Sequence, residues 1–89
     1  RLQVGHVWYT PWCDDEGRVI DDGTVTRTAD DTYRWTAAHP NYRWLLENAH
    51  GLDVAVEDVS EQVAALALQG PTSRALLGAV CGGALDGLK

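Results

Sequence analysis

The sequence is poor in sulfur and in positive charge. Its 89 residues include no methionine, no phenylalanine and 2 cysteines, and 7 basic residues face 13 acids, for a formal net charge of −6. Because no basic patch is present to neutralise phosphates, we expect neither a nucleic-acid partner nor an anionic membrane surface. No apolar run is long enough to span a bilayer. These absences argue against nucleic-acid and membrane functions.

The chain is also short, and it has no initiator methionine. It opens at Arg1 and stops just after a glycine-rich stretch. One domain at most can form at this length, and it would bury only roughly 60–65% of its unfolded surface, so an independent core would be marginal. We therefore expect residues 1–89 to be a fragment of a larger domain.

The cysteines and histidines lack the spacing of a metal or redox site. Cys13 and Cys81 lie far apart, with no C-x-x-C motif and no histidine pair at ligand spacing. Two free thiols in a reducing cytoplasm is the simplest interpretation, and a Cys13–Cys81 disulfide stays open as the alternative. We expect a cytoplasmic protein without a bound metal, in which each histidine has a structural or surface place.

The first half of the chain has the pattern of three strands. Residues 4–13 are rich in valine, tryptophan and tyrosine, residues 19–28 carry many β-branched side chains, and residues 33–37 follow a second turn. Short acids and then Gly17 are typical of a turn with a positive φ. Pro11 cannot donate to a ladder, so we expect an edge or a bulge near it. The pattern predicts an antiparallel meander.

The second half alternates helices and strands. A helix is expected from Pro40, which suits a first turn, to Gly51, which suits a left-handed cap. Residues 53–59 and the apolar residues 63–69 are expected to be strands, and a second helix should run from Gly70-Pro71 to Gly82-Gly83. The order β-β-β-α-β-β-α predicts an α+β fold, an antiparallel sheet with two helices. The expected apolar stripes are Tyr42, Leu45, Leu46 and Ala49 in the first helix, with Trp44 off the stripe, and Thr72, Ala75, Leu76, Ala79 and Val80 in the second.

Two adjacent acids, Asp21 and Asp22, lie inside the second predicted strand. Neighbouring side chains of a strand point to opposite faces, so one of these carboxylates must point inward, where an unpaired charge is costly. A carboxylate in such a place can bind a ligand with N–H donors, orient its ring and stabilise positive charge on nitrogen. Gly23, which has no side chain, would let that ligand approach the backbone.

The hairpin register decides which residue meets Asp22. A four-residue loop, residues 14–17, would pair Cys13 with Arg18 and place Tyr9 opposite Asp22, whereas a five-residue loop would place Thr10 there. One residue of slip exchanges the two faces. We favour the four-residue loop, because Gly17 then closes the turn and a phenol lies beside a carboxylate.

Two simpler roles for the acids stay open. Both could be solvated at a frayed strand or could cap a neighbouring turn. Metal binding is a third interpretation, but the acids of residues 14–22 lack the D-x-D-x-D-G spacing of a calcium loop.

Three segments carry a resemblance to a known family. YTPWCDDEGRVIDDGTVTR, YRWTAA and EDVSEQVAALALQGPTSRALL resemble the glycine-cleavage T-protein (aminomethyltransferase) family. That family has a turn of the type N/D-E-x-G, then G-x-I/V-x-D-D, and later A-L-x-A-L-Q-G-P. The resemblance runs from about Val4 to the end, and the combination of IDDGTV with ALALQGP is more specific than either motif alone.

The resemblance implies a fold and a chemistry. It implies that residues 1–89 are a fragment of a larger N-terminal folate-binding domain in a three-domain protein, with tetrahydrofolate as cofactor in a central channel. It implies transfer of an aminomethyl or methyl group to folate. The key acid of the family, the second of the pair, corresponds to Asp22, as catalytic and folate-binding residue, and a folate-contacting aromatic corresponds to Tyr9.

This sequence departs from the family pattern at two places. Gly23 replaces a usual aliphatic residue, and Ala38 stands where an asparagine usually helps to hold substrate or folate. These variants resemble the demethylase-type branches of the family, which take methyl groups from methoxy or methylamine compounds. Iron–sulfur maturation relatives carry a K-G-C-x-T-type motif that this stretch lacks.

The resemblance also implies partners. We expect a small-molecule one-carbon donor and the remainder of the parent chain, whose activity would be that of an enzyme, with the fragment alone inactive. A non-catalytic folate-binding or interaction module of the same fold is the alternative function. Apolar surface without its neighbours favours self-association, so a homo-oligomer is among the expected partners.

Overall fold

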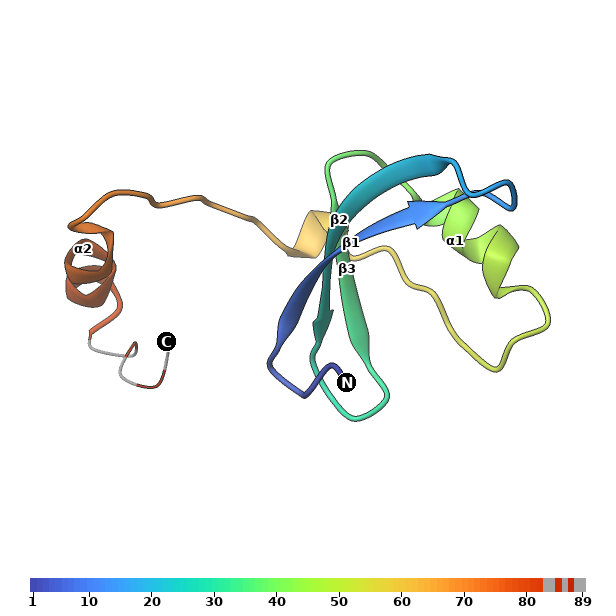
Figure 1. The fold of residues 1–89 in the computed structure, drawn as a ribbon. Helices are drawn as coiled ribbons and strands as arrows, with labels where there is room; N and C mark the ends of the chain where they lie inside the picture. The colour runs from blue at the N-terminus through green and yellow to red at the C-terminus, as the bar shows by residue number, and fades with distance from the viewer. Residues whose placement is uncertain (83–84, 86, 88–89) are drawn as a thin grey trace. The chain divides into compact units, whose positions relative to one another are not determined.

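The computed structural model describes residues 1–82, 85 and 87. The chain divides into two compact units, Arg1–Asp58 and Val59–Lys89. The first unit holds the sheet and one helix, and the second holds a short 3-10 turn and one helix (Figure 1). The α+β class predicted from the sequence is confirmed. In chain order the elements are β1 (Val7–Cys13), β2 (Val19–Arg27), β3 (Tyr33–Ala37), α1 (Tyr42–Ala49), η1 (Ser60–Gln62) and α2 (Ser73–Val80).

The three strands form the expected antiparallel meander, with β2 in the centre. The turn between β1 and β2 is tied by Asp14, whose backbone N–H donates to the carbonyl of Arg18 at 2.9 Å and whose carbonyl accepts the N–H of Gly17 at 3.0 Å. Gly17 has a φ of +79°, as a turn glycine should. Gly5 closes the other end of the sheet by donating its N–H to the carbonyl of Arg27 at 2.8 Å.

The register of the first hairpin differs from the predicted one. Cys13 pairs with Val19, Trp12 pairs with Asp21, and the ladder is irregular between Trp12 and Cys13. The four-residue loop was therefore wrong: the loop is residues 14–18, and Ile20 is an extra residue in β2. This bulge lies one pair away from Pro11, in agreement with the expectation that proline disturbs the ladder there.

The thin core lies on one face of the sheet. Trp12, with 6% of its surface exposed, is the one buried hydrophobic residue in the part of the chain that the structure describes. Its ring meets that of Trp35 edge to face at 4.6 Å, and Trp35 meets Trp44 of α1 at 6.4 Å. Such aromatic pairs contribute roughly 0.5–1.5 kcal/mol beyond the area they bury. Trp44 therefore lies on the inward side of α1, contrary to the predicted stripe.

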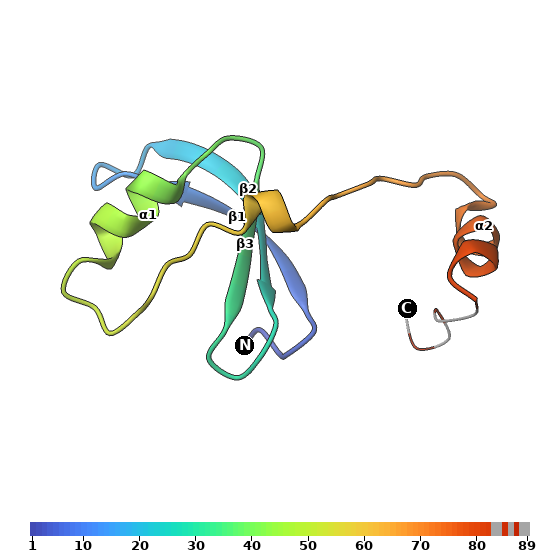
Figure 2. The ribbon, with the colours of Figure 1, turned by 180° about the vertical axis from the view of Figure 1, so that it is seen from behind.

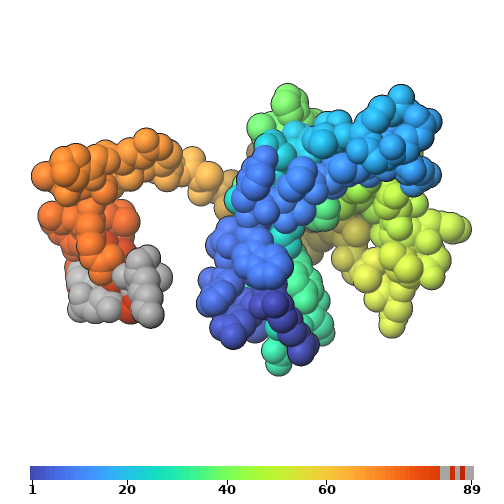
Figure 3. Space-filling model, viewed as in Figure 1, coloured from blue at the N-terminus to red at the C-terminus, as the bar shows by residue number. Residues whose placement is uncertain are grey.

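Helix α1 lies on that side of the sheet, where its Trp44 meets Trp35 and the preceding Asn41 meets Asp21. It lies behind the sheet in Figure 1 and in front of it in the reverse view of Figure 2. The surface of β1 and of the first hairpin is uncovered by α1 on the other side (Figure 3). Both helices begin and end near their predicted limits: Gly51 and Gly82 have φ of +79° and +62° after α1 and α2. Gly83 lies outside the described residues.

The two further strands predicted for residues 53–59 and 63–69 are not confirmed. Neither segment has a ladder partner among the residues that the structure describes, and η1 and irregular backbone occupy this part of the chain. Most of their large apolar side chains are exposed, from Val63 at 44% to Leu66 at 97%, and Val56 is half-buried. Alternation or apolar content makes a segment fit for a strand, but a strand forms only where another edge supplies hydrogen bonds.

Gly23 is required by a close approach of two strands. It pairs with Ala37, and a Cβ built at Gly23 would lie 2.2 Å from the carbonyl oxygen of Thr36. No real Cβ approaches a backbone oxygen so closely, so β3 would have to shift. The space beside Gly23 is thus filled by β3, and the expectation that a ligand approaches there is corrected.

We predict that Gly23→Ala destabilises the protein by about 1–3 kcal/mol, the usual cost of overpacking. Thermal unfolding of the intact protein measures the effect. The matched control is Gly78→Ala in α2, where the new Cβ would meet only Leu85 at an ordinary 3.8 Å. There the better helix propensity of alanine should stabilise the helix by roughly 0.5–1 kcal/mol. Equal effects of the two substitutions would contradict the steric explanation.

We predict an acid-dependent contribution from Asp14. Its carboxylate accepts the N–H groups of Arg18 at 2.9 Å and Glu16 at 3.0 Å. The Arg18 backbone bond is the main reason that the pKa of Asp14 lies below its ordinary value. A lowered pKa means that the stabilisation is present above about pH 4 and is lost as pH falls through the folded-state value.

The measurement is the melting temperature of Asp14→Ala against wild type between pH 7 and pH 2. The deficit of the variant should be largest near neutrality and should shrink as the pH falls. The matched control is Asp15→Ala, which removes the same charge from the next position of the turn. A deficit for Asp14→Ala that stays constant with pH would exclude this role.

Candidate functional site

Tyr9 and Asp22 meet on the uncovered face of the sheet. The hydroxyl of Tyr9 donates to Oδ2 of Asp22 at 2.5 Å, a short bond of the kind that a charged acceptor makes. Tyr9 is 68% exposed, and Asp22 is exposed as well. The sequence analysis placed this phenol beside this carboxylate, and that contact is confirmed although the register behind it was wrong.

Tyr9 and Asp22 still share a face because the two differences from the predicted register add up to two residues. The loop is one residue longer than predicted, and the bulge adds a second residue of slip. A slip of one exchanges the faces of a strand, and a slip of two restores them. Asp22 now pairs with Pro11, and Tyr9 pairs with Thr24. Tyr9 and Asp22 are thus diagonal neighbours on the same face, a separation that a long aromatic side chain can span.

The electrostatics of the pair favour a protonated tyrosine. The hydrogen bond to Asp22 raises the pKa of Tyr9 above its ordinary value, with smaller contributions from desolvation and from the charge of Asp22. The phenol therefore remains a donor and keeps one carboxylate oxygen in place. Within the described chain, the hydroxyl of Tyr9 is the side-chain partner of Asp22, so Oδ1 of Asp22 is available to a further donor.

Asp21 is the acid that points inward. It pairs with Trp12, and its side chain is 14% exposed on the face that α1 covers. Nδ2 of Asn41 donates to its Oδ2 at 2.8 Å, and the backbone N–H of Asp22 donates to its Oδ1 at 2.9 Å. The Asn41 bond is the largest cause, and the Asp22 N–H the next, of a pKa below the ordinary value for Asp21.

The partners of Asp21 were missed by the sequence analysis. Asn41 lies next to α1, and its Nδ2 also donates to the carbonyl of His39 at 2.9 Å. His39, 81% exposed, places its Nδ1 3.7 Å from Oδ1 of Asp21 and adds an ion pair when protonated. No spacing rule joins an acid in the middle of a strand to an amide after the next strand. The one available signal was that one of two adjacent acids in a strand must point inward. A buried carboxylate needs a hydrogen-bond donor close to it, so a partner of this kind could have been expected.

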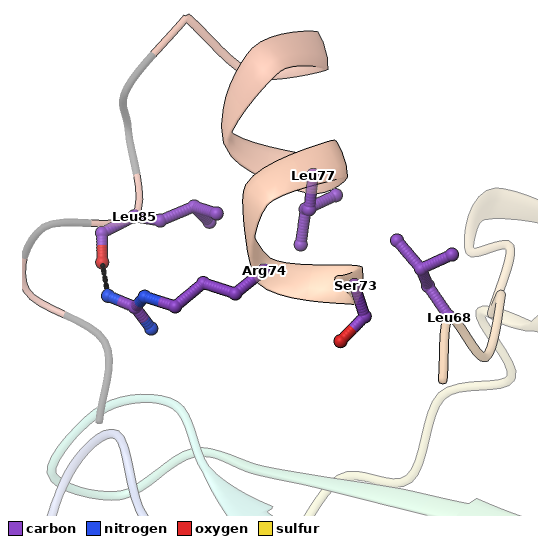
Figure 4. Close-up of a pocket in the computed structure, with 5 residues that line it drawn as sticks. All are labelled: Leu68, Ser73, Arg74, Leu77 and Leu85. Atoms are coloured by element: carbon purple, nitrogen blue, oxygen red, sulfur yellow. Dashed lines mark hydrogen bonds between the residues drawn. The ribbon is translucent and has the colours of Figure 1, made fainter. Parts of the chain in front are cut away.

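A separate groove lies inside the second unit. It has a volume of about 210 Å³ and is lined by Leu68 and by residues of α2, with Leu85 on the other side. Figure 4 shows the guanidinium of Arg74 reaching the carbonyl of Leu85, at 3.0 Å. The walls are mostly apolar, and Ser73 adds a hydroxyl. Within this unit the groove offers no acid that would hold a ring nitrogen.

The described residues offer no other site chemistry of the expected kinds. Among residues 1–82, 85 and 87, no group of three or more histidine, cysteine or acidic side chains is placed to hold a metal ion. Cys13 and Cys81 are both free thiols and both exposed. In the same part of the chain, no helix has the length and apolar character needed to cross a membrane.

Comparison with known proteins places this chain in a family. The family model described as the GCVT N-terminal domain matches residues 1–87. An aminomethyltransferase of Lysinibacillus sphaericus (strain C3-41) is 36% identical over 81 residues, which is 86% of this chain and 22% of that relative. The chain thus spans about a fifth of the length of this curated relative. No solved structure gives a significant match.

The family model covers nearly the whole chain, and it includes both the acid pair and the third segment of the resemblance. The resemblance found from the sequence motifs is confirmed. The chain belongs to the glycine-cleavage T-protein family, as a stretch of its N-terminal domain.

Proposed function

We propose that this chain is part of a tetrahydrofolate-dependent one-carbon transferase, which moves an aminomethyl or methyl group. The observation that carries the proposal is the exposed carboxylate of Asp22, held by Tyr9 on the uncovered face of the sheet. The second support is membership of a family whose curated relative is an aminomethyltransferase. Because the chain covers about a fifth of that relative, the activity belongs to the intact protein.

The residues on this face fit a folate ring. A pterin presents N–H donors along one edge, and a carboxylate is the acceptor that suits them. Asp22 has one oxygen engaged by Tyr9 and another available. Tyr9, with more than half of its surface exposed, adds an aromatic wall beside that acceptor. A carboxylate and a ring wall together can fix both the edge and the plane of a flat heterocycle.

The chemistry is shared between cofactor and protein. Tetrahydrofolate, when bound, supplies the nitrogen that accepts the one-carbon unit. Asp22 binds N–H groups of the ring, orients them and stabilises positive charge that develops nearby. Tyr9 keeps Asp22 in place through its hydroxyl and excludes water with its ring. A phenol carries its proton at neutral pH, and the raised pKa of Tyr9 extends that protonated range to higher pH.

The residues after β3 bear on which compound donates the one-carbon unit. Ala37-Ala38-His39 follows β3, so no amide side chain stands at Ala38, where family members usually carry asparagine. An amide that would contact substrate or folate is thus missing. This supports a demethylase-type donor, a methoxy or methylamine compound, over the aminomethyl donor of glycine cleavage.

We predict that Asp22→Asn weakens tetrahydrofolate binding roughly ten- to hundredfold, because a hydrogen bond to a charged group contributes about 1.5–3 kcal/mol. Isothermal titration calorimetry of the intact protein measures it. Asp15→Asn, which removes an exposed acid from the turn of the same hairpin, is the control and should bind as wild type does. Unchanged binding in Asp22→Asn would refute the role of Asp22. A wild type that binds no tetrahydrofolate would refute the proposed function.

We predict a smaller effect from Tyr9→Phe. The ring wall stays, and only the donor to Asp22 is lost, so binding should weaken about threefold to tenfold. Tyr42→Phe is the control, since Tyr42 lies on α1 and not on the two strands that carry Tyr9 and Asp22, and it should leave the affinity unchanged. The same calorimetric titration reports both. A loss from Tyr42→Phe as large as that from Tyr9→Phe would indicate a general effect on folding instead.

A further inference from the structure

Asp21 is hydrogen-bonded on the covered face and Asp22 lies on the exposed face, so the two acids can have different roles. We propose that Asp21 and Asn41 are positioning residues, which fix the backbone at Asp22 and so hold its carboxylate in the orientation that meets Tyr9. The ligand that benefits is the folate of the proposed function, on which this inference rests for its substrate. The positioning itself is a property of the hairpin.

The backbone of Asp22 needs such support. The ladder between β2 and β3 ends at the pair Gly23–Ala37, so Asp22 lies past the last residue that β3 holds. On its other side stands Pro11, which has no N–H to offer. The bulge near Trp12 loosens the ladder one pair further along. Asp22 therefore has a ladder partner on one side only, and that partner is a proline, although its carboxylate needs a fixed direction.

Asp21 supplies the missing constraint. Its Oδ1 accepts the N–H of Asp22 at 2.9 Å, which ties the peptide between the two acids to a side chain on the covered face. The direction of a strand side chain follows from its backbone, so fixing this peptide fixes the carboxylate of Asp22. The bond thus connects the covered face of the sheet to the uncovered one.

Asn41 holds Asp21 in turn. Its Nδ2 donates to Oδ2 of Asp21 at 2.8 Å and to the carbonyl of His39 at 2.9 Å, so its amide is itself oriented. With 14% of its side chain exposed, Asp21 has few other orientations open to it. Both oxygens of Asp21 are engaged, and neither faces the side on which Tyr9 lies.

A double-mutant cycle separates positioning from simple stabilisation. The affinity of the intact protein for tetrahydrofolate is measured for Asp21→Ala, for Asp22→Asn and for both together. Asp21→Ala should weaken binding about tenfold in the wild-type background and hardly at all when Asp22 is already Asn, because it acts through Asp22. Asp21→Asn has one acceptor oxygen where Asp21 has two, so it can accept from the Asp22 N–H or from Asn41 but not from both, and its affinity should lie between those of the wild type and Asp21→Ala. Losses that add in the double variant would overturn the inference.

A second readout needs no folate. The phenol of Tyr9 is followed by nuclear magnetic resonance in protein labelled with ¹³C at tyrosine, and Tyr9→Phe assigns its signal. Asp22 is the group that raises the pKa of Tyr9. When Asp21→Ala or Asn41→Ala releases Asp22, this pKa should fall toward the ordinary value, about 10. Asn48→Ala is the matched control, because Asn48 donates only within α1, to the carbonyl of Trp44 at 2.8 Å.

The outcomes distinguish this inference from the proposed function. A Tyr9 pKa that is the same in wild type, Asp21→Ala and Asn41→Ala would overturn the positioning role, whatever the affinities. A fall in both variants, with no change in Asn48→Ala, would support it. If the wild type binds no tetrahydrofolate, the proposed function fails, and the Tyr9 titration still decides whether Asp21 and Asn41 position Asp22.

Discussion

The bulge in the first hairpin is the constraint on which the rest of this structure depends. It lies between Trp12 and Cys13, and it sets which side chains of β1 and β2 share a face. With it, Trp12 and Asp21 lie on the side of α1, and Tyr9 and Asp22 lie on the open side. A ladder with the same loop and no bulge would exchange these partners and bring Asp22 to the face that carries the core. The bulge therefore decides both the core and the candidate site.

The acid pair shows how one strand satisfies two opposite demands. A carboxylate on the covered face must be fully hydrogen-bonded, because an unpaired charge there is costly. Asp21 meets that demand with an amide and a backbone N–H. A carboxylate proposed to bind a ligand needs an available oxygen, and Asp22, on the exposed face, has Tyr9 as its one side-chain donor among the residues that the structure describes. The alternation of a strand gives adjacent residues these two environments without any change of fold.

Local pattern was enough to predict the three strands and the helix of residues 7–49, although it also predicted a strand at residues 53–59 that is not confirmed. It was not enough to predict the register between the first two strands. The turn at Gly17, the strand at residues 33–37 and the helix after Pro40 follow from backbone preferences that each residue carries with it. The register does not follow from such preferences. Nothing in the sequence around Ile20 marks it as the extra residue of a bulge, apart from the nearby Pro11. The contact of Tyr9 with Asp22 was predicted correctly only because face parity survives a slip of two residues.

The same distinction explains the second half. Residues 63–69 have the composition of a central strand, but pairing depends on a partner edge, and composition carries no information on which segment supplies it. Trp44 was placed off the apolar stripe for a related reason. The stripe was predicted by counting helical positions from Tyr42. That count takes no account of Trp35, which packs against Trp12 and also meets Trp44 on the inward side of α1. The site partners Asn41 and His39 were missed because they depend on this docking of α1.

The geometry of the open face also limits what this chain contributes to binding. Small-molecule sites bury most of the surface of their ligand, commonly 70–90%. A sheet face on which Tyr9 is 68% exposed forms one wall of such a site and cannot enclose a ring by itself. The contacts that hold the candidate site, from Tyr9 to Asn41, all lie within the first unit. In the proposed function the hairpin therefore fixes the orientation of the folate ring, and the enclosing walls, with most of the buried area, would come from other parts of the intact protein.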